Sequence, residues 1–370
     1  MIAESFEKLS NAQLSENPFP GLRPFELHEG HLFFGREGQS EKLLAKLEAA
    51  RFLAVVGTSG SGKSSLVRAG LVPALFGGMM VSAGSNWRVA LMRPSNNPIG
   101  NLARALSSPE VFGSDIKENA EIQAEVAEAT LRRGNLGLVE AVRLALQTED
   151  ENLLVVVDQF EELFRFAREA GSTRYENDAA AFVKLLLEPS RQHQLEQEEL
   201  RRKNQAIESS LRQQKLSHEE ARREETSVRE AARKRDLRIY VVLTMRSDFL
   251  GDCAKFWDLP EAVNESQYLI PRLTRDQLRE AIAGPVAVGG GQIAPRLVNQ
   301  LLNDIGDNQD QLPVLQHALM RTWDEWKRER ESGGQGDKGT RGQGQSATRG
   351  SQSAIHYSTL LAPHSAFRSD

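Results

Sequence analysis

One short stretch of this chain combines glycine, serine and lysine in a pattern that binds phosphate groups. Residues 57–64 read GTSGSGKS and fit the pattern GxxxxGK[ST]. Glycine is needed because the backbone amides of such a loop turn inward and approach an anion closely. Lys63 would place its positive charge between the β and γ phosphates, and the hydroxyl of Ser64 would bind Mg²⁺. The predicted nucleotide-binding residues here are Gly57, Thr58, Ser59, Gly60, Ser61, Gly62, Lys63, Ser64 and Ser65.

The segments on either side of this loop have the character that such a loop requires. Residues 52–56, FLAVV, are typical of a buried parallel strand, and residues 65–72, SLVRAGLV, predict a helix. The anion would then lie at the positive end of that helix. A glycine-rich turn with an incidental lysine is the alternative interpretation.

A second group of charged residues follows an apolar run later in the chain. Residues 153–157, LLVVV, predict a buried parallel strand, and Asp158 would emerge at its carboxyl edge, where open α/β sheets bind ligands. Asp158 is therefore the predicted Mg²⁺-binding carboxylate, acting through water. Glu161 or Glu162 would orient the attacking water, although both also suit the first turn of an ordinary helix.

Composition limits the classes of protein to which this chain can belong. With 370 residues, 39% of them hydrophobic, the chain can bury a sizeable core. A net charge of −5 gives no general attraction to nucleic acid or to anionic membranes. Because there is no apolar stretch of membrane-spanning length and no signal peptide in residues 1–15, we expect a cytoplasmic protein. The single cysteine, Cys253, excludes an intrachain disulfide and is expected to pack in the core.

The remaining segments define the expected organisation of the chain. Residues 1–16 are expected to be a mobile leader, and residues 17–25, NPFPGLRPF, a fixed extended segment. The segment of about residues 190–236 is rich in charged residues and contains no glycine or proline. This composition predicts an inserted, exposed helix or helical hairpin, to which a protein partner could bind. Residues 331–370 are expected to be a disordered tail.

Several linked motifs resemble one known family. They are NPFPGLRPF with LFFGRE, GTSGSGKSSLVRAGLVPAL, VVVDQFEELF, VVLTMRSDFLGDC, LTRDQLREAIAGP and LPVLQHALMRTW. In this order they resemble the P-loop ATPase domain of the STAND class of signalling NTPases, and most closely the group called novel STAND NTPase 1. The resemblance implies an α/β fold, in which a parallel sheet flanked by helices (residues 17–270) precedes a C-terminal helical lid (residues 271–330). Within the lid we expect helices over residues 273–283, 295–305 and 314–326, with a break at Gly284 and Pro285.

The resemblance also implies roles for particular residues. Related domains carry an acid three residues after the Mg²⁺-binding aspartate, which favours Glu161, and an arginine at the end of the next strand, which matches Arg246. Such an arginine would sense the γ phosphate by its charge, whereas the alternative is a simple ion pair with Asp248. Further nucleotide contacts are implied for Phe34, Gly35, Arg36 and Pro313. The motif around Pro313 normally begins with glycine, where this chain has Gln311.

The implied function is a switch that binds ATP or ADP with Mg²⁺, hydrolyses ATP slowly, and is the regulatory part of a larger signalling protein. Members of the class continue into a winged helix, of which only a stub would fit in residues 331–370, and form homo-oligomers as full-length proteins. Two other functions stay open at this point: a nucleotide-binding module with negligible hydrolysis, and a P-loop phosphotransferase that acts on a separate substrate.

Overall fold

The computed structural model describes residues 17–112, 120–145, 151–171, 173–212, 219, 222, 223, 226, 238–306, 311–333 and 367–369. The chain forms two compact units, each assembled from separate stretches of sequence. The first, which we call the sheet unit, comprises Glu41–Gly57 and Ala74–Ile270. The second, the lid unit, comprises Met1–Ser40, Thr58–Pro73 and Pro271–Asp370. The predicted leader, nearly all of the predicted tail and most of residues 213–237 lie outside the described residues.

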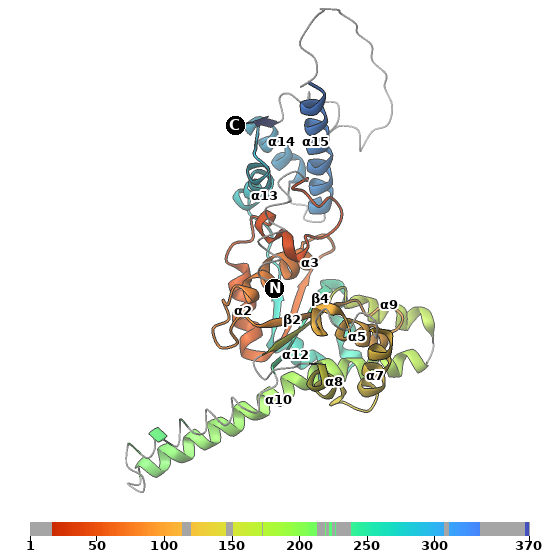
Figure 1. Cartoon of the computed structure of the whole chain (residues 1–370), viewed down its shortest axis with the longest axis vertical. Helices are drawn as coiled ribbons and strands as arrows, with labels where there is room; N and C mark the ends of the chain where they lie inside the picture. Colours follow the sequence, from red (N-terminus) through yellow and green to blue (C-terminus); the bar gives the residue numbers. More distant parts are fainter. Residues whose placement is uncertain are drawn as a thin grey trace, which may run out of the picture. The chain divides into compact units, whose positions relative to one another are not determined.

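The sheet unit contains five parallel strands in the order β2-β3-β4-β1-β5. In chain order they are β1 (Phe52–Gly57), β2 (Trp87–Met92), β3 (Asn152–Val157), β4 (Arg238–Arg246) and β5 (Gln267–Leu269) (Figure 1). Every residue of β1 and of β3 is buried, as expected for parallel strands that are covered on both faces. The predicted α/β fold with a parallel sheet flanked by helices is therefore confirmed.

Helices connect the strands of the sheet unit and cover the sheet. They are α5 (Pro98–Leu106), α6 (Pro109–Phe112), α7 (Ala120–Leu131), α8 (Gly137–Ala145), α9 (Glu161–Ala170), α10 (Thr173–Arg212), the 3-10 helix η4 (Ser247–Lys255) and α12 (Leu259–Glu265). The helix α2 (Gln39–Ala50) leads into β1. The core combines strand residues with aromatic side chains from the helices, and its fully buried members include Phe160, Phe164 and Phe182.

The predicted charged insertion is, in its described part, the second half of a long helix. The helix α10 runs without interruption through Pro189, and its first half buries Phe182 and Leu186. From Gln194 onward most side chains of α10 are exposed. Ion pairs between residues four apart, such as Lys203 Nζ with Glu199 Oε1 at 2.6 Å, support this exposed half.

In the lid unit, helices near the end of the chain surround a second hydrophobic core. They are α13 (Arg275–Val288), α14 (Pro295–Ile305) and α15 (Leu312–Gly333), and a short strand β6 (Gly291–Ile293) pairs antiparallel with β7 (Phe367–Ser369). The predicted break at Gly284 and Pro285 is wrong, since α13 continues to Val288. Proline removes one main-chain hydrogen bond from the helix, but Ile282 and Val286 are buried on either side of it and keep the helix in place.

The segment after the phosphate loop begins as a regular helix and then widens. Lys63–Ser65 form α3, Leu66–Leu71 form the π-helix η2, and Val72–Phe76 form α4. The helix predicted for residues 65–72 is therefore present, with π-helical bonding in its middle. Such π segments are rare and are frequently found at functional sites. Among the helices that the structure describes, none is both long and apolar enough to cross a membrane.

The division of α10 into a packed half and an exposed half generates a prediction about stability. We expect that replacement of residues 194–234 by a short Gly/Ser linker changes the melting temperature by less than about 4 °C, because exposed charged residues contribute little to the core. Phe182→Ala, in the packed half of the same helix, is the contrasting variant and should lower the free energy of unfolding by about 3–5 kcal/mol. A linker variant as unstable as Phe182→Ala would show that the exposed half packs on the fold.

Candidate functional site

The phosphate loop of the lid unit is folded around one of its own carbonyl groups. Lys63 Nζ donates a hydrogen bond to the Thr58 carbonyl oxygen at 2.6 Å, and Ser61 Oγ donates to the same oxygen at 2.8 Å. Gly60 and Gly62 have φ values of 72° and 87°, which a residue with a side chain rarely adopts. The buried lysine is thus held inside the curve of the loop, where the sequence pattern predicts that it binds phosphate.

A buried arginine supports this loop from behind. Arg36 Nη2 donates to the Ser61 carbonyl oxygen at 2.8 Å, and Arg36 Nη1 donates to the Pro271 carbonyl oxygen at 2.9 Å and to Gln39 Oε1 at 3.3 Å. The arginine is only 5% exposed. The guanidinium therefore ties the main chain of the phosphate loop to the segment that enters the lid. Its predicted contact with nucleotide stays a prediction.

The two residues before Arg36 lie against the helix α13. Gly35 has φ 82°, and a Cβ atom there would lie 2.3 Å from the Gln277 carbonyl oxygen, so that only glycine fits. The ring of Phe34 packs against Gly284, where an added Cβ atom would lie 2.5 Å from Cγ of the ring. These contacts explain both glycines by close packing, while the nucleotide contacts expected of Phe34 and Gly35 stay predictions.

In the sheet unit, a threonine fixes the predicted Mg²⁺-binding aspartate. Asp158 follows β3 and is 1% exposed, and Thr244 Oγ1 on the neighbouring strand β4 donates to Asp158 Oδ1 at 2.7 Å. The same hydroxyl accepts a hydrogen bond from the Gln159 amide at 3.0 Å, and the Thr244 carbonyl accepts one from the Phe160 amide at 2.8 Å. Gln159 has φ 57°, so these bonds hold an unfavourable backbone turn.

Sequence reasoning missed Thr244, although a signal was available. It is the single hydroxyl-bearing side chain in the otherwise apolar run of residues 241–245, VVLTM. A polar side chain in a central strand is buried and needs a hydrogen-bonding partner.

The structure places the two neighbouring glutamates in different surroundings. Glu161 is 8% exposed, and its Oε2 accepts a hydrogen bond from the Arg246 amide, at the end of β4, at 3.3 Å. Glu162 Oε2 instead accepts bonds from the amide and the hydroxyl of Ser95, at 3.2 and 3.0 Å. Ser95 lies in the loop after β2 and has φ 47°. Glu162 therefore anchors the loop after β2, whereas Glu161 lies at the carboxyl end of β4.

A tyrosine completes the anchor around Ser95. Tyr175 Oη donates a hydrogen bond to the Ser95 carbonyl oxygen at 2.8 Å. Burial, with a smaller contribution from the charge of Glu162, raises the pKa of Tyr175 to about 12. The phenol therefore stays protonated at neutral pH and continues to donate this bond.

Arg246 has an acidic partner close to it in the chain. Its guanidinium makes two hydrogen bonds with the carboxylate of Asp248, with Nε 3.1 Å from Oδ1, and also lies 5.7 Å from the centre of the Phe249 ring. In the sheet, Arg246 pairs with Gly57, the last residue of β1 and the first of the phosphate-loop motif. The structure thus contains the ion pair considered above as the alternative, and the sensing role of Arg246 stays a prediction.

Pro313 lies in the first turn of α15, next to Gln311, and residues 307–310 before it lie outside the described residues. A proline is well accommodated there because the first amides of a helix have no partner within it. The predicted contact of Pro313 with nucleotide is not tested by this position.

A model of the family described as novel STAND NTPase 1 matches residues 18–201 and 209–337, which is most of the chain. The chain belongs to this family. No curated protein matches the chain. Among solved structures, the ORC2 protein of Aeropyrum pernix, determined as ADPNP and ADP complexes, is similar with a TM-score of 0.41 and 13% sequence identity. The similarity covers 81% of this chain and 63% of that one, so that the match spans less than two thirds of that protein.

The bonds of Thr244 generate a testable prediction for this novel STAND NTPase 1 domain. Thr244→Val removes the hydroxyl but keeps the shape, which leaves the buried Asp158 carboxylate and the Gln159 amide each without one partner. We expect a loss of about 1–3 kcal/mol in the free energy of unfolding, measured by urea denaturation. Thr130→Val is the matched control, because the buried Thr130 hydroxyl bonds only along its own helix, to the Val126 carbonyl at 2.9 Å. Equal losses in the two variants would contradict a special role for Thr244.

Proposed function

We propose that this chain binds Mg·ATP and hydrolyses it slowly, and that it acts as the nucleotide-dependent switch of a larger signalling protein. Membership of the novel STAND NTPase 1 family makes it a nucleotide-binding domain of the P-loop type. The observation that carries the proposal is the phosphate loop itself. Its buried lysine, bonded to a carbonyl of the loop, and its two left-handed glycines support this interpretation of the sequence pattern.

The residues proposed to hold Mg²⁺ suit the chemistry of that ion. Mg²⁺ takes oxygen ligands, usually keeps several waters and is bound through one or two carboxylates plus the phosphates of the substrate. The hydroxyl of Ser64 would be one ligand, and the carboxylate of Asp158 would bind through water. Asp158 Oδ1 is already occupied by the Thr244 hydroxyl, which orients the carboxylate without removing its charge.

The contacts of the two glutamates support Glu161 as the residue that polarises the attacking water. Its carboxylate accepts a main-chain hydrogen bond from the Arg246 amide at the end of β4, which helps to fix its position. Glu162 is engaged by both donors of Ser95, so we propose a positioning role for it. A carboxylate that polarises water needs a fixed position within hydrogen-bonding reach of that water.

Arg246 is proposed to respond to the γ phosphate. In this structure its charge is paired with Asp248, and side chains of both residues are substantially exposed, at 41% and 52%. An exposed pair of this kind contributes little energy, so that a phosphate group with more negative charge would compete for the arginine. The difference between ATP and ADP would then be read as a change of partner.

The wider roles are part of the same proposal. We propose a cytoplasmic location, self-association in the context of a longer protein, and a protein partner for the exposed half of α10. The two alternative functions differ from the proposed one in the fate of bound ATP. A binding module leaves ATP intact, and a phosphotransferase passes a phosphoryl group to a separate substrate. Single-turnover measurements distinguish these outcomes.

The first test addresses binding. Lys63→Ala should weaken Mg·ATP binding by about 2–4 kcal/mol, because the charge-assisted contact with the phosphates is lost. Titration calorimetry measures this change, with Lys42→Ala as the control, since Lys42 is exposed on α2 and outside the loop. Unchanged affinity in Lys63→Ala would overturn the assignment of the phosphate loop.

The second test separates binding from cleavage. Glu161→Gln should retain bound ATP but slow its cleavage in a single turnover by a factor of about 10²–10⁴, the usual contribution of a positioned base. Asp158→Asn should impair the Mg²⁺-dependent reaction, and Glu162→Gln should have the smaller effect on cleavage. If Glu162→Gln stops turnover while Glu161→Gln does not, the two roles are reversed. If the wild-type protein binds ATP without cleaving it, the chain is a binding module.

A further inference from the structure

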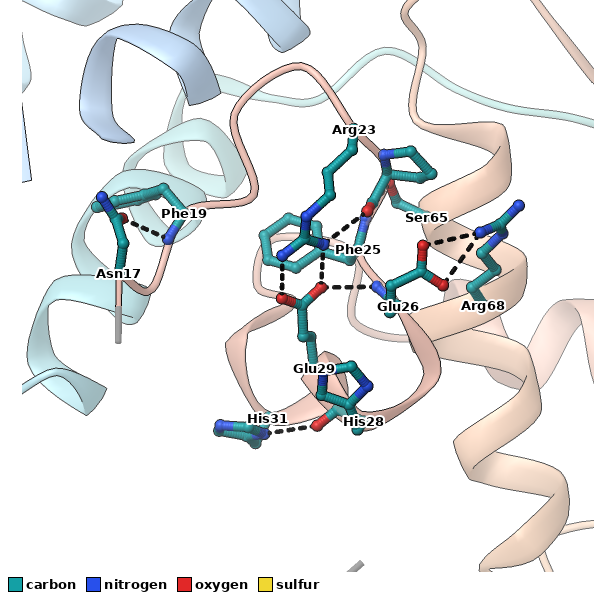
Figure 2. A network of polar contacts seen from close by, with 11 residues as sticks. Asn17, Phe19, Arg23, Phe25, Glu26, His28, Glu29, His31, Ser65 and Arg68 are labelled. Carbon is teal, nitrogen blue, oxygen red and sulfur yellow. Dashed lines mark hydrogen bonds and ion pairs between the residues drawn. The ribbon is translucent and has the colours of Figure 1, made fainter. Parts of the chain in front are cut away.

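Residues 17–33 connect two parts of the lid unit that lie far apart in the sequence, and we call them the strap. One end of the strap contacts the lid helix α15, and the other contacts η2, the π-helix that follows the phosphate loop. Figure 2 shows the polar contacts along this segment, from Asn17 to Arg68. These contacts join parts of the protein to one another and do not themselves bind a phosphate.

The lid end of the strap is fixed by specific bonds to α15. Asn17 Nδ2 donates to the Met320 carbonyl oxygen and to Asp324 Oδ1, both at 2.7 Å. The side chain of Phe19 is 2% exposed and packs edge-on against Trp323, with the ring centres 6.5 Å apart. These contacts leave the lid end little freedom to slide along the helix.

The loop end is fixed to the residues directly after the phosphate loop. The Phe25 amide donates a hydrogen bond to Ser65 Oγ at 3.2 Å, and the carboxylate of Glu26 makes two bonds with Arg68 Nη1, at 2.9 and 3.0 Å. Because Ser65 Oγ accepts a bond from the strap, that bond restricts the directions in which the hydroxyl can donate its own proton. The strap therefore sets the orientation of a hydroxyl next to the proposed Mg²⁺ ligand Ser64.

The strap is stiff between its two ends. It contains three prolines, at positions 18, 20 and 24, which restrict the backbone. Arg23 donates to both carboxylate oxygens of Glu29, at 2.7 and 2.6 Å, and Glu29 Oε2 also accepts a bond from the Glu26 amide at 2.7 Å. Burial alone would raise the pKa of Glu29, but these hydrogen bonds outweigh it and hold the pKa below its usual value, so that Glu29 is charged at neutral pH.

We propose that the strap couples the phosphate loop to the lid helix α15, with Phe25 as the positioning residue for Ser65, Glu26 as the attachment to Arg68 and Asn17 as the attachment to the lid. A stiff segment fixed at both ends transmits a displacement from one end to the other. Coupling between two sites is reciprocal: if bound nucleotide strengthens or weakens the attachment at α15, the attachment changes the affinity for nucleotide by the same free energy. This proposal rests on the proposed function, because it assumes that nucleotide binds at the phosphate loop.

The test alters the lid end and measures the loop end. Asn17→Ala removes both bonds to α15 and touches neither Ser65 nor Arg68. We expect it to weaken ADP and ATP-analogue binding about 5- to 10-fold, at the lower end of measured coupling between sites. It should also speed amide hydrogen exchange in residues 64–70 of the nucleotide-free protein. Glu26→Gln, at the loop end, should produce the same changes. The double variant should bind nucleotide no more weakly than the single variant with the larger effect.

The controls separate coupling from simple destabilisation. Glu325→Gln breaks an exposed pair with Arg328 on the same helix as Asp324 and should change neither affinity nor exchange in residues 64–70. If Asn17→Ala does not fold, Asn17→Ser, which keeps a donor, replaces it. Faster exchange confined to residues 17–22 and α15, with exchange in residues 64–70 unchanged, would overturn the coupling. Absence of nucleotide binding by the wild-type protein would refute the proposed function instead, and the exchange measurements would still decide whether the strap couples its ends.

Discussion

The structure depends on one constraint: a tightly curved loop with left-handed glycines cannot hold its shape by itself. Glycines permit the left-handed turn but do not favour it over other backbone conformations. Glycine also loses more conformational entropy on folding than any other residue. In this chain the shape is fixed by groups that converge on loop carbonyls. Lys63 and Ser61 share the Thr58 oxygen from within, and Arg36 holds the Ser61 oxygen from behind. A buried guanidinium that binds carbonyl oxygens is well suited to this task, because its five donors lie in one rigid plane.

The carboxyl edge of the sheet uses the same kind of support. Thr244 contributes a hydroxyl and a carbonyl to three consecutive residues after β3, so that the carboxylate of Asp158 has a defined direction. Ser95 and Tyr175 do the same for Glu162. In both cases a charged side chain is oriented by hydrogen bonds from uncharged partners. Carboxylates held in fixed directions suit the site proposed to bind Mg²⁺.

The lid unit shows why residues near the start of the chain belong with residues near its end. Phe19 completes the aromatic cluster of α15, and the ring of Phe34 fills the space that Gly284 leaves on α13. The helices α15 and α13 therefore need these two residues to cover their apolar faces. The strap is therefore a part of the lid core that also reaches the phosphate-loop segment, which is the physical basis for the coupling proposed above.

The sequence by itself determined the strand, loop and helix around residues 57–64, the position of Asp158 at the end of a buried strand, and the family, because these follow from local order and apolar runs. It also located the helices α13, α14 and α15, although it predicted a break at Pro285 that the buried neighbours Ile282 and Val286 prevent. Only the tertiary structure showed the separate partners of Glu161 and Glu162, the bonds of Thr244 to the residues after β3, and the contacts of the strap. Each of these depends on which side chains meet across strands or across the lid core, and no local pattern in a single sequence carries that information.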